Sequence, residues 1–488
     1  MIKPADVFDR DREWAQLTDF FSDDREGATL GVVSGRRRQG KSFLLQAACQ
    51  EADGFYFSAP EATEAESLAM VGSALTRYLD PPAPIVPRDW PTLIDILLRI
   101  GREQVVPVVI DEFPYLARAA PELPSLIQAA YAPRRAERTS SRTRLLLCGS
   151  ALSFMGGLLA GSSPLRGRAS LDLTVQTLDY RTAGEFWGLE DPRLAFLVHA
   201  VVGGTPAYRT EMIRYDTPRG LADFDDWVVR TVLSPGSPMF LEARYLLAEE
   251  SGLRDTALYH SVLAAIASGN SGRGAIAGHV GRKANELAHP LTVLEDAGLI
   301  AREADAFRAN RSEFRICEPL LAFYHAIMRP FWPQLLRGTG ADQAWANSKH
   351  RFASSILGPH FERLCRDWML HFAGDRFGGW PVQVAAGTVN DPDSHAVAQV
   401  DVVALGHTDG ERPPILAIGE AKSGDVMGLG HLDRLRRVRD LLRRNDSYDT
   451  SATRLVCCSG VGFTEDLHRL ADQGEVDLVG LEELYRAP

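Results

Sequence analysis

The chain has 488 residues, of which 45% are hydrophobic, so it is longer than one hydrophobic core usually supports and can bury several. Its formal net charge of -11 excludes a protein that binds nucleic acid over its whole surface, so any such contact must be local. The N-terminus has no apolar signal core, and no stretch of about 18 uncharged apolar residues occurs. We therefore expect a cytoplasmic protein of about two to four domains, with no membrane contact.

Apolar runs alternate with amphipathic segments in the first part of the chain. The runs lie at residues 30–34, 54–57, 105–110 and 144–148. Continuous apolar runs separated by helical segments are typical of a parallel sheet that is covered on both faces. From Thr182 the pattern becomes helical without clear strands, and Thr182 with Glu185 predicts a capping box. The sequence therefore predicts an α/β core followed by a small helical lid.

A phosphate-binding motif follows the first apolar run. Residues 35–42 have the sequence GRRRQGKS, which fits the pattern G-x-x-x-x-G-K-[ST] between a strand and a helix. Gly35 and Gly40 let backbone N–H groups face phosphate oxygens, and the N-terminus of the following helix adds a favourable dipole. Lys41 is expected to bridge the β- and γ-phosphates, while Ser42 binds Mg²⁺. The motif predicts binding and hydrolysis of a nucleoside triphosphate, with ATP and Mg²⁺ as the ligands.

Two acids end the strand predicted at residues 105–110, as the second half of such a site requires. Asp111 is expected to hold Mg²⁺ through water, and Glu112 could orient the attacking water; the alternative is an ordinary passage from strand to loop. Ser150, at the end of the next strand, could contact the γ-phosphate or cap the following helix. Arg38, in the phosphate-binding loop, completes the predicted nucleotide-binding set.

A loop is expected at residues 163–168, where the sequence SPLRGR offers Arg166 and Arg168. The loose transition state of phosphoryl transfer is stabilised by an arginine that a neighbouring subunit can supply. Either arginine could have this role in a homo-oligomer, or both could be solvated surface residues.

Residues 256–330 combine helical periodicity with two short strand candidates, at 295–302 and 313–317, which is the order of a winged helix-turn-helix. Basic residues that could reach DNA phosphates are Arg273, Arg282 and Lys283. Pro290 falls inside the expected recognition helix, where it removes a hydrogen-bond donor and clashes with the preceding turn. The winged helix could therefore bind DNA, or it could transmit the nucleotide state to the next domain.

A second α/β unit is predicted after a linker. Two prolines, Pro330 and Pro333, and two glycines, Gly338 and Gly340, interrupt any periodic element here, and we assign residues 331–349 as the linker. Beyond it, strand candidates lie at 397–405, 415–421 and 454–458. A turn signal predicts a hairpin between the first two, and pairing about Gly410 and Glu411 sets Asp401 opposite Glu420.

Two carboxylates and a lysine are expected to converge on this hairpin. Glu420 and Lys422 share one face because side chains alternate along a strand, and a twisted hairpin brings Asp401 to the same corner. The set suits phosphodiester hydrolysis assisted by Mg²⁺ or Mn²⁺, in which Asp401 and Glu420 bind the metal and Lys422 positions water or stabilises charge. An E-x-K pattern also occurs on exposed strand faces, but the apolar flanks here predict a buried strand, where a charge requires a reason.

The segment at residues 431–444 has the pattern of an amphipathic helix. Its apolar face comprises Leu432, Leu435, Val438 and Leu442, and its six arginines lie mostly on the other faces. These arginines could contact a DNA backbone, which would reconcile DNA binding with an acidic chain, or they could form a solvated basic face.

Together these motifs resemble a family of archaeal and bacterial AAA-like ATPases, related to the STAND signalling ATPases, that carry a C-terminal restriction-endonuclease-like domain. The similarity covers nearly the whole chain and is far more specific than the phosphate-binding loop alone. Its marks are Phe8–Glu13, Gly35–Ser42, Ile110–Tyr115, Cys148–Ser150, Pro164–Arg168 and Gly203–Pro206.

The resemblance implies further roles for particular residues. It makes Arg168 the arginine finger and places residues 203–208 in the lid that senses the nucleotide state. It also implies that Glu362, on a helix, completes the metal corner of a PD-(D/E)xK nuclease site, although Glu362 could equally be a solvated helix residue.

The expected architecture is a multidomain α/β protein with five segments. These are a P-loop ATPase core at 1–180, a helical lid at 181–255, a winged helix at 256–330, the linker at 331–349 and a nuclease-like domain at 350–488. Our hypothesis is an ATPase that controls a metal-dependent DNA nuclease through the winged helix. The alternative is an NTP-dependent regulatory scaffold whose C-terminal domain binds nucleic acid or protein without cleaving.

Overall fold

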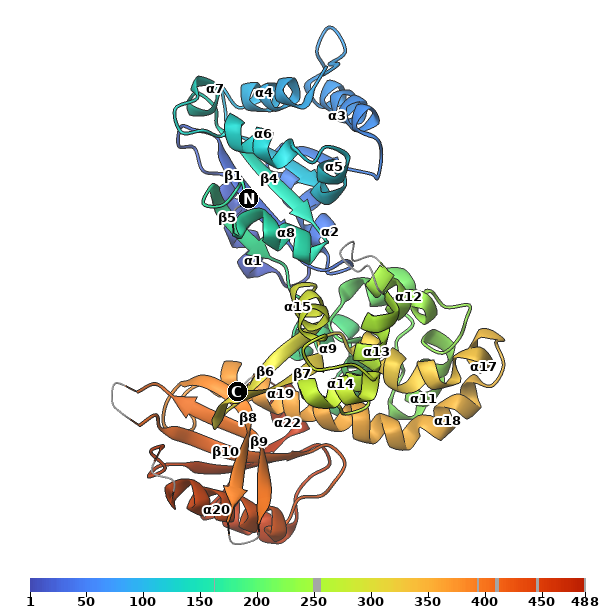
Figure 1. The fold of residues 1–488 in the computed structure, drawn as a ribbon, viewed down its shortest axis with the longest axis vertical. Coiled ribbons are helices and arrows are strands. Elements are labelled where there is room, and N and C mark those ends of the chain that lie inside the picture. Colours follow the sequence, from blue (N-terminus) through green and yellow to red (C-terminus); the bar gives the residue numbers. More distant parts are fainter. Residues whose placement is uncertain (162, 249–255, 393–394, 409–411, 445–446, 487–488) are drawn as a thin grey trace. The chain divides into compact units, whose positions relative to one another are not determined.

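The computed structural model describes residues 1–161, 163–248, 256–392, 395–408, 412–444 and 447–486. Its contacts divide the chain into two compact units, of which the first consists almost entirely of Met1–Thr177 and the second begins at Leu178 (Figure 1). Among the helices of the described residues, none is long and apolar enough to cross a membrane.

The first unit is built around a parallel sheet with the strand order β2-β3-β4-β1-β5. Its strands are β1 (Thr29–Ser34), β2 (Phe55–Ser58), β3 (Val106–Asp111), β4 (Thr143–Gly149) and β5 (Ala169–Thr174). The first four lie at the predicted apolar runs. The strand β5 was not predicted, because most of its residues are half-exposed or exposed and it lacks a continuous apolar run.

Helices cover both faces of this sheet, as the apolar runs predicted. Val33, Val109 and Leu146 pack in one core with α1 and α2, and their strand neighbours, such as Val32 and Val108, pack in a second core on the opposite face. The helices of the unit are α1 (Asp11–Phe21), α2 (Lys41–Glu51), α3 (Glu64–Leu79), α4 (Trp90–Ile100), α5 (Phe113–Ala119), α6 (Leu123–Ala130), α7 (Ala136–Thr139) and α8 (Leu152–Leu159).

The second unit begins with helices. They include α9 (Tyr180–Trp187), α10 (Pro192–Val202), α11 (Phe224–Thr231) and α12 (Pro238–Ala248). The predicted cap at Thr182 is wrong, because Asp179 caps α9 and accepts hydrogen bonds from the backbone N–H groups of Arg181 at 2.8 Å and Thr182 at 3.1 Å. A carboxylate three residues earlier satisfies the free donors of the first turn, so the helix starts there.

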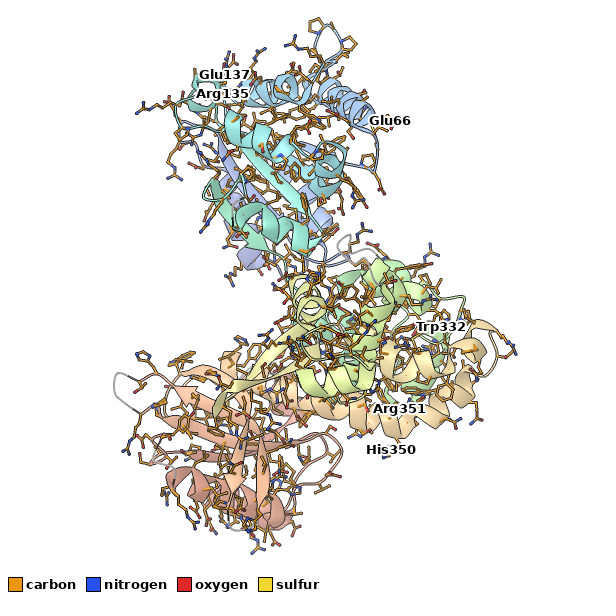
Figure 2. The ribbon with its side chains drawn as sticks, viewed as in Figure 1. Glu66, Arg135, Glu137, Trp332, His350 and Arg351 are labelled. Atoms are coloured by element: carbon orange, nitrogen blue, oxygen red, sulfur yellow. The ribbon has the colours of Figure 1, made fainter. Side chains whose placement is uncertain are left out.

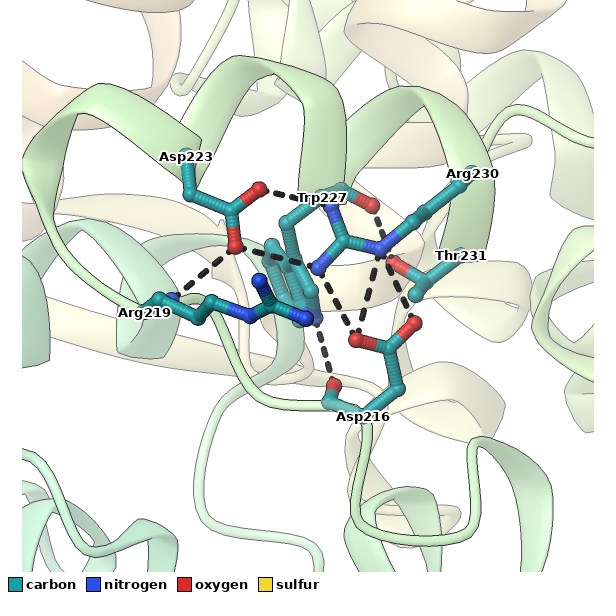
Figure 3. A network of polar contacts seen from close by, with 6 residues as sticks. All are labelled: Asp216, Arg219, Asp223, Trp227, Arg230 and Thr231. Atoms are coloured by element: carbon teal, nitrogen blue, oxygen red, sulfur yellow. Dashed lines mark hydrogen bonds and ion pairs between the residues drawn. The ribbon is translucent and has the colours of Figure 1, made fainter.

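A polar network fastens the segment before α11 to that helix (Figure 3). Arg230 donates hydrogen bonds to the carboxylates of Asp216 and Asp223, with nitrogen–oxygen distances of 2.9 Å to each. Trp227, on the same helix, donates its ring N–H to the carbonyl of Asp216 at 2.8 Å. One guanidinium thus holds two acids of the connecting loop.

We expect Arg230→Met to lower the free energy of unfolding by about 1–2 kcal/mol, because two carboxylates lose their shared partner. The effect is modest since the Arg230 side chain is 38% exposed and solvent screens the pairs. Urea unfolding of the variant measures it. Arg219→Met serves as the control, because Arg219 contacts Asp223 through its backbone N–H; an equal loss in both variants would contradict the assignment.

The next segment holds three helices and a two-stranded antiparallel sheet. These are α13 (Thr256–Ala267), α14 (Arg273–Val280), α15 (Ala288–Asp296), β6 (Ile300–Asp305) and β7 (Arg308–Ile316). The expectation that Pro290 would interrupt a helix is wrong. Helix α15 begins at Ala288, so Pro290 lies in its first turn. In the first turn, the N–H that proline lacks would have no intrahelical partner. Pro290 is therefore compatible with a helix at this position.

Residues 331–349, which we expected to be a linker, are largely helical. They include α17 (Trp332–Leu336) and most of α18 (Ala341–Arg351), and the prolines lie in first turns, where helices accept them. Trp332, labelled in Figure 2, stacks on Phe240 of α12 with ring centroids 4.6 Å apart. The segment is therefore packed against the helices that precede it.

The C-terminal part of the second unit is a mixed sheet with the strand order β12-β11-β10-β9-β8. Its strands are β8 (Pro381–Asp391), β9 (Ala396–Gly406), β10 (Ile415–Lys422), β11 (Arg454–Ser459) and β12 (Asp477–Gly480). Neighbours from β8 to β10 are antiparallel, and those from β10 to β12 are parallel. The three strands predicted from sequence are β9, β10 and β11, in the middle of the sheet.

Helices cover both faces of this sheet as well. On one face, α19 (Gly358–His371) contributes Phe361, Leu364 and Trp368 to the core, and α22 (Leu481–Tyr485) packs beside it. On the other face lies α20 (Leu429–Arg444), whose predicted apolar stripe is buried, and α21 (Glu465–Asp472) follows β11. The predicted turn at Gly410 and Glu411 lies outside the described residues.

Candidate functional site

The phosphate-binding motif forms the turn between β1 and α2. Gly35 has φ 146°, Arg38 has φ 66° and Gly40 has φ 85°, so the chain repeatedly takes conformations that glycine adopts most easily. A Cβ atom on Gly35 would lie 2.5 Å from the carbonyl oxygen of Val175, so only glycine fits there. The residue types of the motif therefore follow from the shape of the loop.

Lys41 is the first residue of α2 and only 5% exposed. Its Nζ donates a hydrogen bond to the carbonyl oxygen of Arg36 at 2.6 Å, so the ammonium lies against the main chain of the loop. Burial lowers the pKa of Lys41. Ser42, which follows it, is exposed in the first turn of α2.

Asp111 ends β3 on the same side of the sheet as the phosphate-binding loop. The two meet there because β1, β4 and β3 are neighbouring parallel strands, whose carboxyl ends lie together. The carboxylate is buried; its Oδ2 accepts a hydrogen bond from the hydroxyl of Tyr56 at 2.7 Å, and its Oδ1 accepts one from the backbone N–H of Glu112 at 2.9 Å. Burial, with the nearby Asp111 carboxylate, raises the pKa of Tyr56. Tyr56 thus fixes the orientation of the predicted Mg²⁺ acid.

Glu112 is held by a chain of hydrogen bonds that starts in the phosphate-binding loop. Arg37 donates from Nε to Ser150 Oγ at 3.2 Å and from its NH2 group to the Tyr115 hydroxyl at 2.8 Å. Ser150 Oγ lies 3.1 Å and 3.2 Å from the two carboxylate oxygens of Glu112, to which it donates. Ser150 does not cap α8, whose N-cap is Ala151.

Strand order explains why these residues meet. Because β4 lies between β1 and β3, Ser150 at the end of β4 falls between the phosphate-binding loop and Glu112. The sequence pointed to Ser150 but not to Tyr56, Arg37 or Tyr115 as partners. Nothing in a single sequence shows which strand lies beside which, so these partnerships had no local signal.

Arg168 lies at the amino ends of the strands, whereas the phosphate-binding loop lies at their carboxyl ends. It precedes β5, whose first residue, Ala169, pairs with Leu30 at the start of β1, whereas the phosphate-binding loop follows the end of β1. The length of β1 separates the two by about 17 Å, which exceeds the reach of an arginine side chain. Arg168 is therefore placed away from the predicted nucleotide site of its own chain.

Residues 203–208 follow α10 in the second unit, where a turn at Gly203 and Gly204 leads into the π-helix that begins at Tyr208. Gly203 has φ 63°, and a Cβ on Gly204 would lie 1.9 Å from the carbonyl oxygen of Leu178. The backbone N–H of Leu178 donates a hydrogen bond to the carbonyl of Gly204 at 2.9 Å. Gly203 is thus favoured by its positive φ, and Gly204 is required by the close approach of the Leu178 backbone.

The C-terminal hairpin has the register that the sequence predicted. Gly419 pairs with Val402 and Ile418 with Val403, and the next step along this register brings Glu420 opposite Asp401. Lys422 Nζ lies 3.3 Å from Asp401 Oδ2 and 3.1 Å from Glu420 Oε1. Burial alone would lower the pKa of Lys422, but the two carboxylates raise it above its usual value.

Glu362 of α19 is half-buried near Asp401, but among the described residues it does not form a cluster of three carboxylates with Asp401 and Glu420. Burial, together with the neighbouring Asp401 carboxylate, raises the pKa of Glu362 to about 7. Arg366, one turn further along α19, donates from its NH1 group to the carbonyl oxygen of Asp401 at 3.0 Å. The helix therefore lies directly against the strand that carries Asp401.

Carboxylate oxygens are the ligands that Mg²⁺ and Mn²⁺ prefer, so the donor set fits a hard divalent cation. Across the described part of the chain, no group of three or more His, Cys, Asp or Glu side chains is close enough to hold a metal ion by itself. A cation at Asp401 and Glu420 would take its other ligands from water and phosphate, as Mg²⁺ commonly does.

Several arginines of α20 are paired with acids. Arg434 donates from its NH1 group to Glu420 Oε1 at 2.9 Å, a contact that the sequence did not predict. Arg437 forms an ion pair with Asp391, and Arg436 pairs with Asp433 at 3.0 Å. The basic face of α20 is thus partly neutralised within the protein.

Comparisons with known proteins bear on the fold. No protein-family model matches the chain, and a search of curated proteins found no match. A solved Walker-type ATPase of Pyrococcus abyssi shares 21% sequence identity at a TM-score of 0.50, over 66% of this chain and 97% of that one. The ORC2 protein of Aeropyrum pernix shares 15% at a TM-score of 0.44, over 72% and 97%. The first of these shows that the chain has the parallel-sheet α/β fold of a P-loop ATPase.

Proposed function

We propose that this protein is an ATPase whose nucleotide state controls a metal-dependent DNA nuclease site in its C-terminal domain. The observation that carries the nuclease assignment is the position of Lys422 Nζ, 3.3 Å and 3.1 Å from the carboxylates of Asp401 and Glu420. The assignment of the ATPase rests on the loop around Gly35 and on the fold shared with a solved Walker-type ATPase.

At the nucleotide site, Lys41 would exchange the carbonyl of Arg36 for the β- and γ-phosphates of ATP, and Ser42 and Asp111 would hold Mg²⁺. Glu112 would orient the attacking water once it is released from Ser150, and Arg38 lies at the turn of the loop.

An arginine finger would have to come from another copy of the chain. Arg168 lies too far from the phosphate-binding loop of its own chain to serve it, so its role requires a homo-oligomer. The proposed role of Arg168 therefore implies a homo-oligomer in which each site is completed by a neighbour.

At the nuclease site, Asp401 and Glu420 would hold a divalent cation, with Glu362 beside them. When bound, the cation would polarise a phosphodiester and activate a water molecule. Lys422 would place that water or stabilise the charge that develops on the phosphate. Glu362 has a pKa near neutrality, so it can give or accept a proton at this corner.

The hairpin of β6 and β7, the proposed wing, supports the idea of control through the winged helix. Ala306, in its turn, donates its backbone N–H to the carbonyl of Ala386 on β8 at 2.8 Å. Asp305 accepts a 2.5 Å hydrogen bond from the Thr388 hydroxyl, and Tyr448 donates its hydroxyl to the carbonyl of Ala306 at 3.2 Å. The hairpin is thus joined to the edge of the C-terminal sheet.

One arginine links this hairpin to the predicted metal strand. Arg366 donates to Asp401 O at 3.0 Å and to Glu303 Oε2 of β6 at 3.4 Å, and Arg315 of β7 also pairs with Glu303. Burial alone would raise the pKa of Glu303, but the two arginines lower it, so the carboxylate stays charged. A displacement of the hairpin would therefore move the backbone of Asp401.

A second candidate function is a nucleotide-dependent scaffold that binds nucleic acid or a protein partner without cleaving. The Arg434–Glu420 pair favours it, because an arginine on a metal-binding carboxylate competes with the metal. Cleavage assays decide between the two candidates.

We expect the protein to cleave DNA in Mg²⁺ or Mn²⁺ and in one of its nucleotide states, and Glu420→Ala and Lys422→Ala to lower the rate by about 100-fold or more. The measurement is loss of labelled single- and double-stranded DNA with no nucleotide, ADP, ATP or a non-hydrolysable analogue. Asp472→Asn, an exposed acid of the same domain, is the control and should cleave normally. Intact DNA under every condition would favour the scaffold instead.

A further inference from the structure

Glu420 has two cationic partners on one oxygen. Its Oε1 accepts a hydrogen bond from Arg434 NH1 at 2.9 Å and forms an ion pair with Lys422 Nζ at 3.1 Å. The Glu420 side chain is 5% exposed, whereas that of Arg434 is 46% exposed. A buried carboxylate is therefore neutralised from the rim of the site by a half-exposed arginine.

The four side chains that form ion pairs at this corner already balance in charge without a metal. Asp401 and Glu420 supply two negative charges, and Lys422 and Arg434 supply two positive ones. A divalent cation would add two positive charges where the carboxylates are nearly dry and where like charges repel strongly. Binding of the cation therefore favours a state in which one of the two side-chain cations has left.

Arg434 is the cation that can leave more easily. Lys422 lies on the same strand as Glu420, contacts both carboxylates and is 29% exposed. Arg434 comes from α20, contacts only one of the two, and reaches water with much of its long side chain. A second hydrogen bond, from its NH2 group to the carbonyl of Gln399 at 3.0 Å, keeps it close to the corner.

We propose that Arg434 is the internal counter-ion of the metal-free site, which a divalent cation displaces from Glu420 and which then contacts a phosphate of the bound DNA. The guanidinium fork suits a phosphate as well as it suits a carboxylate, so the released group has a partner as soon as DNA is present. Metal binding and a phosphate contact are thereby coupled through one side chain. This inference rests on the proposed nuclease function.

The first test measures Ca²⁺ binding to the nucleotide-free full chain by calorimetry. Glu420→Gln defines the signal of this site. Arg434→Met should bind Ca²⁺ roughly tenfold more tightly than the unaltered protein, because the competing guanidinium is gone. Arg469→Met, an exposed arginine on α21 paired with Asp466, should bind as the unaltered protein does. Equal or weaker Ca²⁺ affinity in Arg434→Met would overturn the proposal.

The second test measures DNA binding over a range of salt concentrations, with and without Ca²⁺. For the unaltered protein, the slope of log affinity against log salt should steepen by about one unit in Ca²⁺, because one more phosphate is contacted. Arg434→Met should show no such change, and the same steepening in this variant would refute the phosphate contact. If Ca²⁺ binding to the unaltered protein does not depend on Glu420 in the calorimetric test, the proposed nuclease site itself is wrong. If binding depends on Glu420 but Arg434→Met leaves the Ca²⁺ affinity unchanged, only the role proposed for Arg434 is wrong.

Discussion

Replacing Lys41 with alanine should lower ATP turnover by about 100-fold or more, because no other cation of the loop would bridge the β- and γ-phosphates. The variant also leaves the Arg36 carbonyl without the ammonium that now lies 2.6 Å away, so the empty loop itself is expected to loosen. Release of phosphate under saturating ATP and Mg²⁺ measures the effect. Gln46→Ala, an exposed residue one turn further along α2, should turn over normally.

Glu112→Gln separates binding from hydrolysis. It should bind a fluorescent ATP analogue as tightly as the unaltered protein does and lose turnover, because the amide cannot accept a proton from water. The Ser150 hydroxyl still has an oxygen to donate to, so the local structure is preserved. Normal turnover in either Lys41→Ala or Glu112→Gln would show that the site lies elsewhere.

Two buried histidines should contribute about 4 kcal/mol of destabilisation to the second unit when the pH falls from 7.5 to 5, while protonation of Glu362, whose pKa is raised, acts in the opposite sense. His199 of α10 and His360 of α19 lie 2.9 Å apart at Nδ1 and Nε2, and both are 8% exposed. Burial lowers the pKa of His199 to about 3, and burial with the Arg363 guanidinium lowers the pKa of His360. Below pH 6.5 the unfolded chain therefore binds protons that the folded chain cannot bind.

Urea unfolding at both pH values measures this effect. The double variant His199→Asn and His360→Gln keeps polar atoms near the contacting nitrogens but cannot titrate, so the difference between the two pH values should shrink by about 4 kcal/mol. The measured quantity is the difference in free energy of unfolding between pH 7.5 and pH 5. A loss of stability that is equal at both pH values cancels from this difference. His371→Asn, an exposed residue of α19, should keep the full pH dependence, and an unchanged difference in the double variant would disprove the assignment.

Much of the fold could be predicted from the sequence where the signals are local. Gly35 and Gly40 lie between an apolar run and a helical segment, and their positions need no knowledge of the rest of the chain. The register that brings Glu420 to Asp401 was also predictable, because a hairpin fixes pairing by counting from its turn. The edge strands β5 and β8 were not predicted, since most of their residues are half-exposed or exposed.

The partners of the site residues could not be predicted, because they come from distant parts of the chain. Tyr56 meets Asp111 across 55 residues, and Arg366 meets Asp401 across 35. Arg434 was assigned only to a basic helix face, and its contact with Glu420 depends on how α20 packs against the sheet. Charge and periodicity identify such residues, but only the tertiary arrangement pairs them.

The attachment of β6 and β7 to β8 has a consequence for how this protein can be divided. Phe307, in the turn of the hairpin, packs edge-on against Tyr448 at 5.4 Å and lies against Gly387 of β8, where a Cβ would come within 2.6 Å of its ring. A C-terminal fragment that began at residue 350 would uncover this apolar contact and the free edge of β8. A piece that keeps its surface closed must include residues 300–316 as well as α9 and α10, which share the core of this sheet. Substitutions at Phe307 and Gly387 must be compatible with each other.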